Sequence, residues 1–272
     1  MIAIMINSRD RATELALLLQ SLRTQTVQDF DIFIIDDCSG TLLNQYHFFN
    51  CMINRLKSEG HKVFIKRNNN VIGIAKGRQD IVDWVKETPF EYEYFCRLDD
   101  DVVLERDYLE RLIKVIDKGY DLASGVTVPM FQPTIKRDPK FLNGIANQVV
   151  LDKDGNYIKN GDDCGMGYTD SVILPAHHFR SCALYKSKIH EDANYETIKL
   201  SPKGFREEQF FSYNLTLAGY KIGVDTGAIN YHQITPSGGC RHPNEANLGQ
   251  GDQKQFEDFT KLNKDRLMEL FK

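Results

Sequence analysis

The sequence lacks paired cysteines. Its six cysteines are widely scattered, and none belongs to the C-x-x-C pairs from which zinc ribbons and redox motifs are built. Neither a zinc site of that type nor a disulfide framework is therefore indicated. Free thiols in a reducing, cytoplasmic compartment are expected for Cys38, Cys51, Cys96, Cys164, Cys182 and Cys240.

A basic leader and long apolar runs are also absent. The apolar run at residues 2–6 is far shorter than the ~20 residues that a membrane-spanning helix needs. With a net charge of −4 and only short basic clusters, the chain shows no electrostatic footprint for nucleic acid. We expect a soluble protein with no nucleic-acid partner and no membrane span, and peripheral membrane contact stays open.

What is present is an alternation of buried strands and amphipathic helices. Apolar strand patterns at residues 2–6, 31–35, 62–66 and 92–98 are each followed by apolar residues at helical spacing. This order predicts an α/β fold with a mostly parallel central sheet and helices on both faces. No G-x-G-x-x-G follows the first strand, which argues against an ordinary dinucleotide-binding fold.

The pattern loosens in the second half of the chain. We predict loops over residues 129–170, a helix at 206–218, a mobile Gly-rich stretch at 235–251 and a terminal helix at 253–271. Further strands are predicted at residues 121–128, 179–185, 221–224 and 228–231. One domain with a C-terminal helical extension accounts for the 272 residues.

Three consecutive carboxylates, Asp99 to Asp101, follow the strand that ends at Leu98. Ligands bind at that edge of open α/β sheets, and adjacent negative charges repel one another unless a cation or solvent relieves them. In extended chain Asp99 and Asp101 point to one side and can share a hard divalent ion, while Asp100 points away. A solvated acidic turn or a helix N-cap cluster is the alternative interpretation.

Nine blocks, in family order over residues 1–245, resemble family 2 glycosyltransferases of the GT-A fold. Each block is short, but the ordered set is specific. The blocks are IMINSRD (4–10), LRTQT (22–26), IIDDCS (34–39), NVIGIAKGR (70–78), LDDD (98–101), FREEQF (205–210), AGYK (218–221), YH (231–232) and PSGGCR (236–241).

The resemblance implies a GT-A domain at residues 1–245, with a nucleotide-binding half (1–128), an acceptor-binding half (129–245) and a helical extension (246–272). It implies a metal-dependent, inverting hexosyl- or N-acetylhexosaminyl-transferase. Such an enzyme moves a sugar from a nucleotide-diphosphate sugar, by family habit a UDP-sugar, to a hydroxyl of a glycan, lipid-linked or other acceptor. Donor contacts are implied for Asn7, Ser8, Arg9, Asp36, Asp37, Arg78, Asp99, Asp100 and Arg241.

By the same resemblance, Asn7 and Asp37 would flank the nucleotide base, where a carboxylate can accept a hydrogen bond from a ring N–H. One of Asp36 and Asp37 would instead only cap the following helix. Arg78 would meet the base or the diphosphate, with a surface cation as the alternative. Arg241 would belong to a Gly-rich lid over the phosphates, for which a plain flexible loop is the alternative.

The resemblance makes Asp99 and Asp101 a D-x-D motif for Mn²⁺ or Mg²⁺. His232 would be a further metal or phosphate contact that favours Mn²⁺, unless it is structural. Glu208 would be the general base, and Glu207 would hold an acceptor hydroxyl or orient the site. Many relatives have Glu-Asp here, so the assignment within the pair stays open, and either acid could simply favour the first turn of a helix.

The acceptor pocket would involve the region of Asp162, Asp163, His177 and His178, with at most one of the histidines in contact with acceptor. A zinc site formed by these histidines and Cys182 lacks diagnostic ligand spacing.

Two other functions are weighed against transfer. The intact acid set Asp99, Asp101 and Glu208 argues against a catalytically silent GT-A domain that binds nucleotide or glycan, because such a domain has no use for a base at Glu208. A nucleotidylyltransferase should show a Gly-rich, basic phosphate loop after the first strand, and residues 7–10 do not form one.

Overall fold

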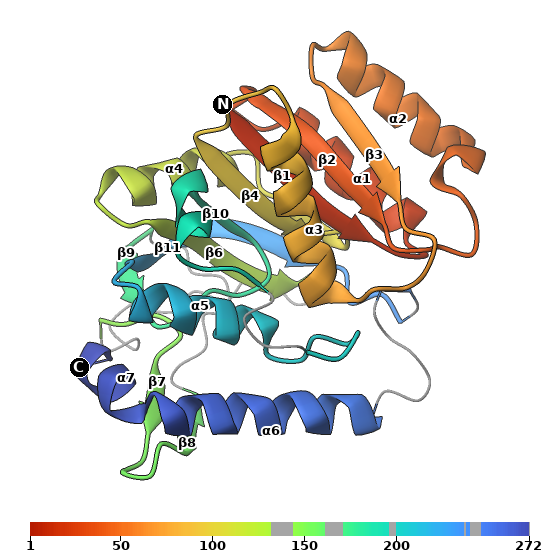
Figure 1. Ribbon diagram of the computed structural model, residues 1–272. Helices are drawn as coiled ribbons and strands as arrows, with labels where there is room; N and C mark the ends of the chain where they lie inside the picture. Colours follow the sequence, from red (N-terminus) through yellow and green to blue (C-terminus); the bar gives the residue numbers. More distant parts are fainter. Residues whose placement is uncertain (132–143, 161–170, 196–199, 237, 240–245, 272) are drawn as a thin grey trace.

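A central sheet lies between layers of helices in the computed structural model, which describes residues 1–131, 144–160, 171–195, 200–236, 238–239 and 246–271 (Figure 1). Four neighbouring strands run parallel in the order β3, β2, β1, β4. They are β1 (Ile2–Ser8), β2 (Phe30–Asp36), β3 (Val63–Arg67) and β4 (Tyr94–Asp99). Parallel strands end at the same edge, so the polar residues that follow them gather there.

The residues of β1 alternate between two helical layers. Ile4 and Ile6 belong to a buried cluster with α1 (Ala12–Arg23), α2 (His47–Ser58) and α4 (Tyr108–Asp117). Ala3 and Met5 belong to a second cluster with α3 (Ile74–Glu87) and α5 (Glu207–Leu217). Because successive strand residues face opposite sides of a sheet, helices cover both faces, as predicted. Short 3₁₀ turns lie at Leu43–Gln45 and Ser187–Glu191.

Beyond β4 the sheet continues through β10, β6, β11 and β5, and β9 pairs with β11. These strands are β5 (Val102–Leu104), β6 (Leu122–Pro129), β9 (Ile173–Ala176), β10 (Ala183–Lys186) and β11 (Ile222–His232). Strand β10 runs antiparallel to both of its neighbours, β4 and β6. It comes from the predicted acceptor-binding half, so the two predicted halves share one sheet.

Several predicted strands differ from the structure. The two strands expected at 221–224 and 228–231 are one strand, β11, with an irregularity between Val224 and Ile229. The predicted strand at 179–185 is regular only from Ala183. Within the predicted loop 129–170, β7 (Val149–Leu151) and β8 (Tyr157–Asn160) pair with each other. Strands of three or four residues are too short for their periodicity to be recognised.

The C-terminal helix is also longer than predicted and is broken in two. α6 (Ala246–Leu262) begins inside the Gly-rich stretch that was expected to be mobile, and α7 (Lys264–Leu270) follows it. Phe210 and Tyr213 of α5 form a separate apolar cluster with Phe256 and Leu267. Figure 1 shows α6 running alongside α5. Among the described residues no helix is long and apolar enough to cross a membrane.

The irregularity in β11 requires a glycine in β6. Ser124 pairs with Val224 and Val126 with Ile229, so Gly125 faces the extra residues of β11. A Cβ at Gly125 would lie 2.0 Å from the backbone oxygen of Ala228. We therefore expect Gly125→Ala to lower the free energy of unfolding by about 1–3 kcal/mol, measured by urea unfolding.

Gly251→Ala is the matched control. This glycine lies inside α6, and a Cβ there would meet nothing within 4 Å. Alanine favours a helix interior by roughly 0.5–1 kcal/mol over glycine, so this variant should be no less stable than the wild type. Equal effects of the two substitutions would contradict the steric explanation.

Candidate functional site

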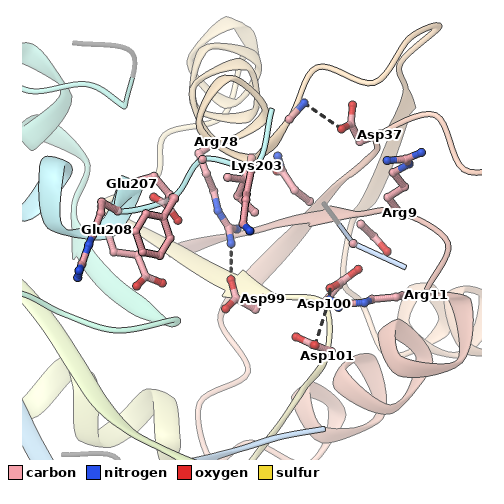
Figure 2. A pocket seen from close by; sticks show the side chains of 18 of the residues that line it. Arg9, Arg11, Asp37, Arg78, Asp99, Asp100, Asp101, Lys203, Glu207 and Glu208 are labelled. Atoms are coloured by element: carbon pink, nitrogen blue, oxygen red, sulfur yellow. Dashed lines mark hydrogen bonds and ion pairs between the residues drawn. The ribbon is translucent and has the colours of Figure 1, made fainter. Parts of the chain in front are cut away.

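A cavity of about 400 Å³ opens at the carboxyl ends of β1 and β4 and beside the start of α5 (Figure 2). Its walls come from parts of the chain more than 200 residues apart, from Asn7 to His232. Most of the predicted site residues line it. They are Asn7, Ser8, Arg9, Asp37, Arg78, Asp99, Asp100, Asp101, Glu207, Glu208 and His232. Asp36 is buried and does not line the cavity, and Arg241 lies outside the described residues.

The two acids after β2 have different surroundings. Asp36 is buried, pairs with Arg67 at 2.7 Å and accepts a hydrogen bond from the Ser39 backbone N–H. Asp37 lines the cavity and accepts hydrogen bonds from the backbone N–H groups of Ile72 and Gly73. Asp36 therefore holds the loop in place, while Asp37 joins that loop to the start of α3.

Arg78 is a buried cation. Its side chain is 1% exposed, so the alternative of a surface cation on α3 is wrong. It donates to the Leu98 carbonyl at 3.0 Å and pairs with the Asp99 carboxylate. The Ser181 hydroxyl donates to the other Asp99 oxygen at 2.6 Å. Burial opposes ionisation of Asp99, but Arg78, Arg97 and Ser181 hold the pKa of this carboxyl below its usual value.

The side chains of Asp100 and Asp101 both contact Arg11, with oxygen to Nη1 distances of 2.9 and 3.0 Å. The expectation that Asp100 points away is therefore wrong, because it lines the cavity together with Asp99 and Asp101 (Figure 2). Strand β4 ends at Asp99 and a turn begins at Asp100, so the alternation of extended chain does not continue. Burial raises the pKa of Asp100 to about 6, against the opposing effect of Arg11.

Asp101 and His232 are the pair best suited to a divalent ion. Neighbouring ligands of an octahedral ion with bonds of ~2.1 Å lie about 3.0 Å apart. Asp101 Oδ2 and His232 Nε2 are 3.1 Å apart, which fits. The hydrogen bond to Asp101 raises the pKa of His232, although burial opposes it. Among the described residues no three His, Cys, Asp or Glu side chains form a complete site, so other ligands would come from water or a bound molecule.

The two glutamates that open α5 differ in their partners. Glu207 forms a two-pronged ion pair with Arg97, at 2.7 and 2.9 Å. Glu208 accepts from the Ser181 backbone N–H at 2.8 Å and lies 3.5 Å from Arg97 Nη2. Burial, together with the Glu207 charge, raises the pKa of Glu208 to about 7. Glu208 is therefore the acid in this cavity with the pKa closest to neutral among those that shift, and a good candidate for accepting a proton.

Four of the residues at this site were not found by sequence reasoning. Arg11, Arg97 and Ser181 contact its acids, and Lys203 lines the cavity. Only Arg97 and Arg11 lie beside recognised blocks, and nothing in their spacing indicates an ion pair. The backbone at Gly239 closes on the site by donating to the Arg9 carbonyl at 2.8 Å.

The histidines expected near the acceptor lie elsewhere. His177 accepts from the Val149 backbone N–H and stacks on Phe271 of the C-terminal segment. His178 is 1% exposed and contacts the Phe179 carbonyl through Nδ1. Neither lines the cavity, and no zinc cluster that includes Cys182 is found among the described residues. Asp162 and Asp163 lie outside the described residues.

Residues 3–173 match one family model, described as glycosyl transferase family 2. No curated protein sequence matches the chain.

Solved structures resemble the chain over most of its length. S. aureus TarS residues 1–349 superpose with a TM-score of 0.57 and 15% identity, over 85% of this chain and 60% of that one. GalNAc-T7, solved with UDP, GalNAc and Mn²⁺, superposes with a TM-score of 0.69 and 13% identity, over 98% of this chain and 49% of that one. TarS residues 1–349 in complex with UDP-GlcNAc superpose with a TM-score of 0.56 and 15% identity, over 87% of this chain and 59% of that one. These are GT-A glycosyltransferases, which confirms the predicted fold, and this chain spans about half to three fifths of their length.

The raised pKa of Glu208 makes a prediction about stability. Its folded pKa of about 7 exceeds the ordinary value of 4.5, so the folded state binds this proton more tightly than the unfolded state. Stability from this group is therefore present below the ordinary value and is lost as the pH rises toward 7. As the pH rises from 5 to 8, the free energy of unfolding of the wild type should fall relative to that of Glu208→Gln, measured by urea unfolding.

Glu110→Gln provides a control of opposite sign. The hydrogen bond from Lys114 lowers the pKa of the exposed Glu110 carboxyl, so the wild type should not lose stability relative to this variant as the pH rises. A stability difference for Glu208→Gln that does not change with pH would contradict the raised pKa.

Proposed function

Because this chain belongs to glycosyl transferase family 2, we propose that it moves a sugar from a nucleotide-diphosphate donor to an acceptor hydroxyl. The observation that carries the proposal is that a single cavity contains the paired Asp101 and His232 together with Glu208. Such a cavity holds both requirements of the reaction: charge stabilisation at a leaving diphosphate and a base for the attacking hydroxyl.

A UDP-sugar is the proposed donor. TarS and GalNAc-T7, which share the fold, were solved with UDP-GlcNAc and with UDP and GalNAc. This supports a hexosyl- or N-acetylhexosaminyl-transferase. The donor would contact Asn7, Ser8 and Arg9 after β1, Asp37 after β2, and the Arg78–Asp99 pair, with Asp100 beside them. Roles for Asp36, which does not line the cavity, and for Arg241 stay predictions.

Asp101 and His232 would hold Mn²⁺ or Mg²⁺, and an imidazole ligand favours Mn²⁺. Asp99 would join them only by giving up one of its bonds to Arg78 and Ser181. A divalent ion there supplies Lewis-acid stabilisation of the charge on the departing nucleotide. Arg11 already neutralises part of the acid cluster, so it would help to hold Asp100 and Asp101 in place before donor binds.

Glu208 would act as the general base. Its carboxylate takes the proton of the acceptor hydroxyl as the oxygen bonds to the anomeric carbon. The bond from that carbon to the diphosphate breaks at the same time, and the diphosphate leaves with the electron pair. Attack from the face opposite the leaving group inverts the configuration. Glu207, fixed on Arg97, would position Glu208 and the acceptor.

The acceptor would be a glycan, a lipid-linked sugar or another hydroxyl compound. A cytoplasmic location, expected from the scattered thiols, stays a prediction. The second candidate is a catalytically silent domain that binds nucleotide or glycan. The raised pKa of Glu208 favours the enzyme, because a binding module has no need for a base that is poised near neutral pH.

The metal assignment is tested with Asp101→Asn. Loss of one ligand charge should weaken UDP binding in the presence of Mn²⁺ by about 10- to 100-fold, measured by calorimetry. Asp107→Asn is the control, because Asp107 pairs with Arg111 outside the cavity, and its UDP affinity should match the wild type. Unchanged UDP affinity in Asp101→Asn would place the metal ligands elsewhere.

The base is tested with Glu208→Gln. Transfer should fall by roughly 10²- to 10⁴-fold while the affinity for UDP and Mn²⁺ is retained. In the wild type the rate should rise with pH through about 7, as Glu208 loses its proton. The exposed Glu110→Gln variant should keep full activity. Full activity in Glu208→Gln would move the base, with Glu207 the next candidate.

A further inference from the structure

A second hollow, of about 490 Å³, adjoins the first cavity. It lies between the loop at residues 201–206 and the first half of α6, and we call it the α6 groove. Lys203 and Phe205 line both hollows. A molecule lying in the α6 groove would therefore reach the cavity that contains Glu208. The volume is within the ~300–1,000 Å³ of ordinary ligand sites.

One buried carboxylate fixes the wall of the α6 groove. Asp252 of α6 is 1% exposed and accepts three hydrogen bonds from the loop before α5. The donors are the Ser201 backbone N–H and hydroxyl, both at 2.7 Å, and the Phe205 backbone N–H at 2.9 Å. Three such bonds to a buried charge hold the loop against the helix, so Lys203 and Phe205 are positioned before any ligand arrives.

A second chain of hydrogen bonds engages the one acid in the α6 groove. Gln253 accepts from Arg206 Nε at 3.0 Å and donates to Glu257 Oε1 at 2.8 Å. The lining also contains Lys203 and Lys254, and neither forms an ion pair within the part of the chain that the structure describes. Two unpaired cations against one hydrogen-bonded acid leave the α6 groove positive and suited to an anion.

Phe205 supplies an apolar surface where the two hollows meet. Its side chain is 40% exposed, and the Arg206 guanidinium carbon lies 4.9 Å from the ring centroid. An ordered aromatic ring beside hydrogen-bonding groups can bind the apolar face of a sugar ring. The Lys203 side chain lies over Gly249 of α6, where a Cβ would be in van der Waals contact with it, 3.6 Å from its Nζ, so the lysine itself forms part of the wall of the α6 groove.

We propose that the α6 groove is an acceptor subsite for a carbohydrate that carries a negative charge. The sugar ring would lie on Phe205, its carboxylate or phosphate would meet Lys254 and Lys203, and its hydroxyl would face Glu208. This inference rests on the proposed function, because it takes the molecule in the first cavity to be the donor. A uronic acid and a phosphorylated sugar would both supply the charge.

Three monosaccharide probes test the proposal: methyl β-glucoside, methyl β-glucuronide and glucose 6-phosphate. Their binding is measured by saturation-transfer NMR on the full chain with UDP and Mn²⁺ present. At least one anionic probe should bind more tightly than the neutral one. Lys254→Gln should weaken binding of the anionic probe about fivefold without changing methyl β-glucoside binding. Phe205→Leu should weaken all three.

Lys261→Gln is the matched control. Lys261 is an exposed lysine of the same helix and does not line the α6 groove, so this variant should bind the probes like the wild type. The two anionic probes separate carboxylate from phosphate as the natural charge. Binding of UDP to Lys254→Gln, measured by calorimetry, should equal that of the wild type.

Three results would overturn the subsite: no probe binds, all three bind equally, or Lys254→Gln and Lys261→Gln behave alike. These outcomes can be told apart from failure of the proposed function, in which UDP fails to bind the wild type. Folding of each variant is checked by its urea unfolding midpoint. Beside Lys254→Gln we measure the charge-retaining Lys254→Arg. That variant should keep the anionic preference, and its loss there would also count against the proposal.

Discussion

A buried cation, Arg97, holds the two sides of the candidate site's cavity together. Its side chain is 1% exposed and pairs with Glu207, and its guanidinium carbon lies 5.0 Å from the centroid of the Phe179 ring. Leaving such a charge without its partner costs roughly 3–5 kcal/mol, so Glu207 has to lie beside the end of β4. That requirement fixes where α5 begins. Glu208, one residue further on, is placed within 3.5 Å of the same guanidinium.

The charges around the cavity explain why Glu208 differs from the other acids. Asp99 forms an ion pair with Arg78, and Asp100 and Asp101 both pair with Arg11. Glu207 pairs with two nitrogens of the Arg97 guanidinium. The short contact of Glu208 is with a neutral backbone N–H instead. Burial then dominates and raises the pKa of Glu208 to about 7, whereas Arg78 and Arg97 hold the pKa of Asp99 below its usual value. One cavity thus holds an acid whose pKa is lowered, Asp99, and another, Glu208, that can exchange a proton near pH 7.

Sequence patterns located this cavity because its main loops follow parallel strands. Such strands end together, so the polar residues at the ends of β1, β2 and β4 had to meet. The orientations within the cavity depend on contacts that no local pattern contains. Asp100 turned toward Arg11 because a turn replaces extended chain after Asp99. His177 is buried because it stacks on Phe271, a residue far along the chain that the histidine's own neighbours in sequence do not indicate.

The start of α6 shows the same dependence on distant contacts. Glycines disfavour helix, and Gly249 and Gly251 led to the prediction of a mobile stretch. Asp252 overrides that preference, since its three hydrogen bonds to residues 201–205 form only when this segment is helical and lies against the loop. The family match ends at residue 173, so both walls of the α6 groove belong to the part of the chain beyond it. A shared donor side and a separately built acceptor side would let one fold serve different acceptors.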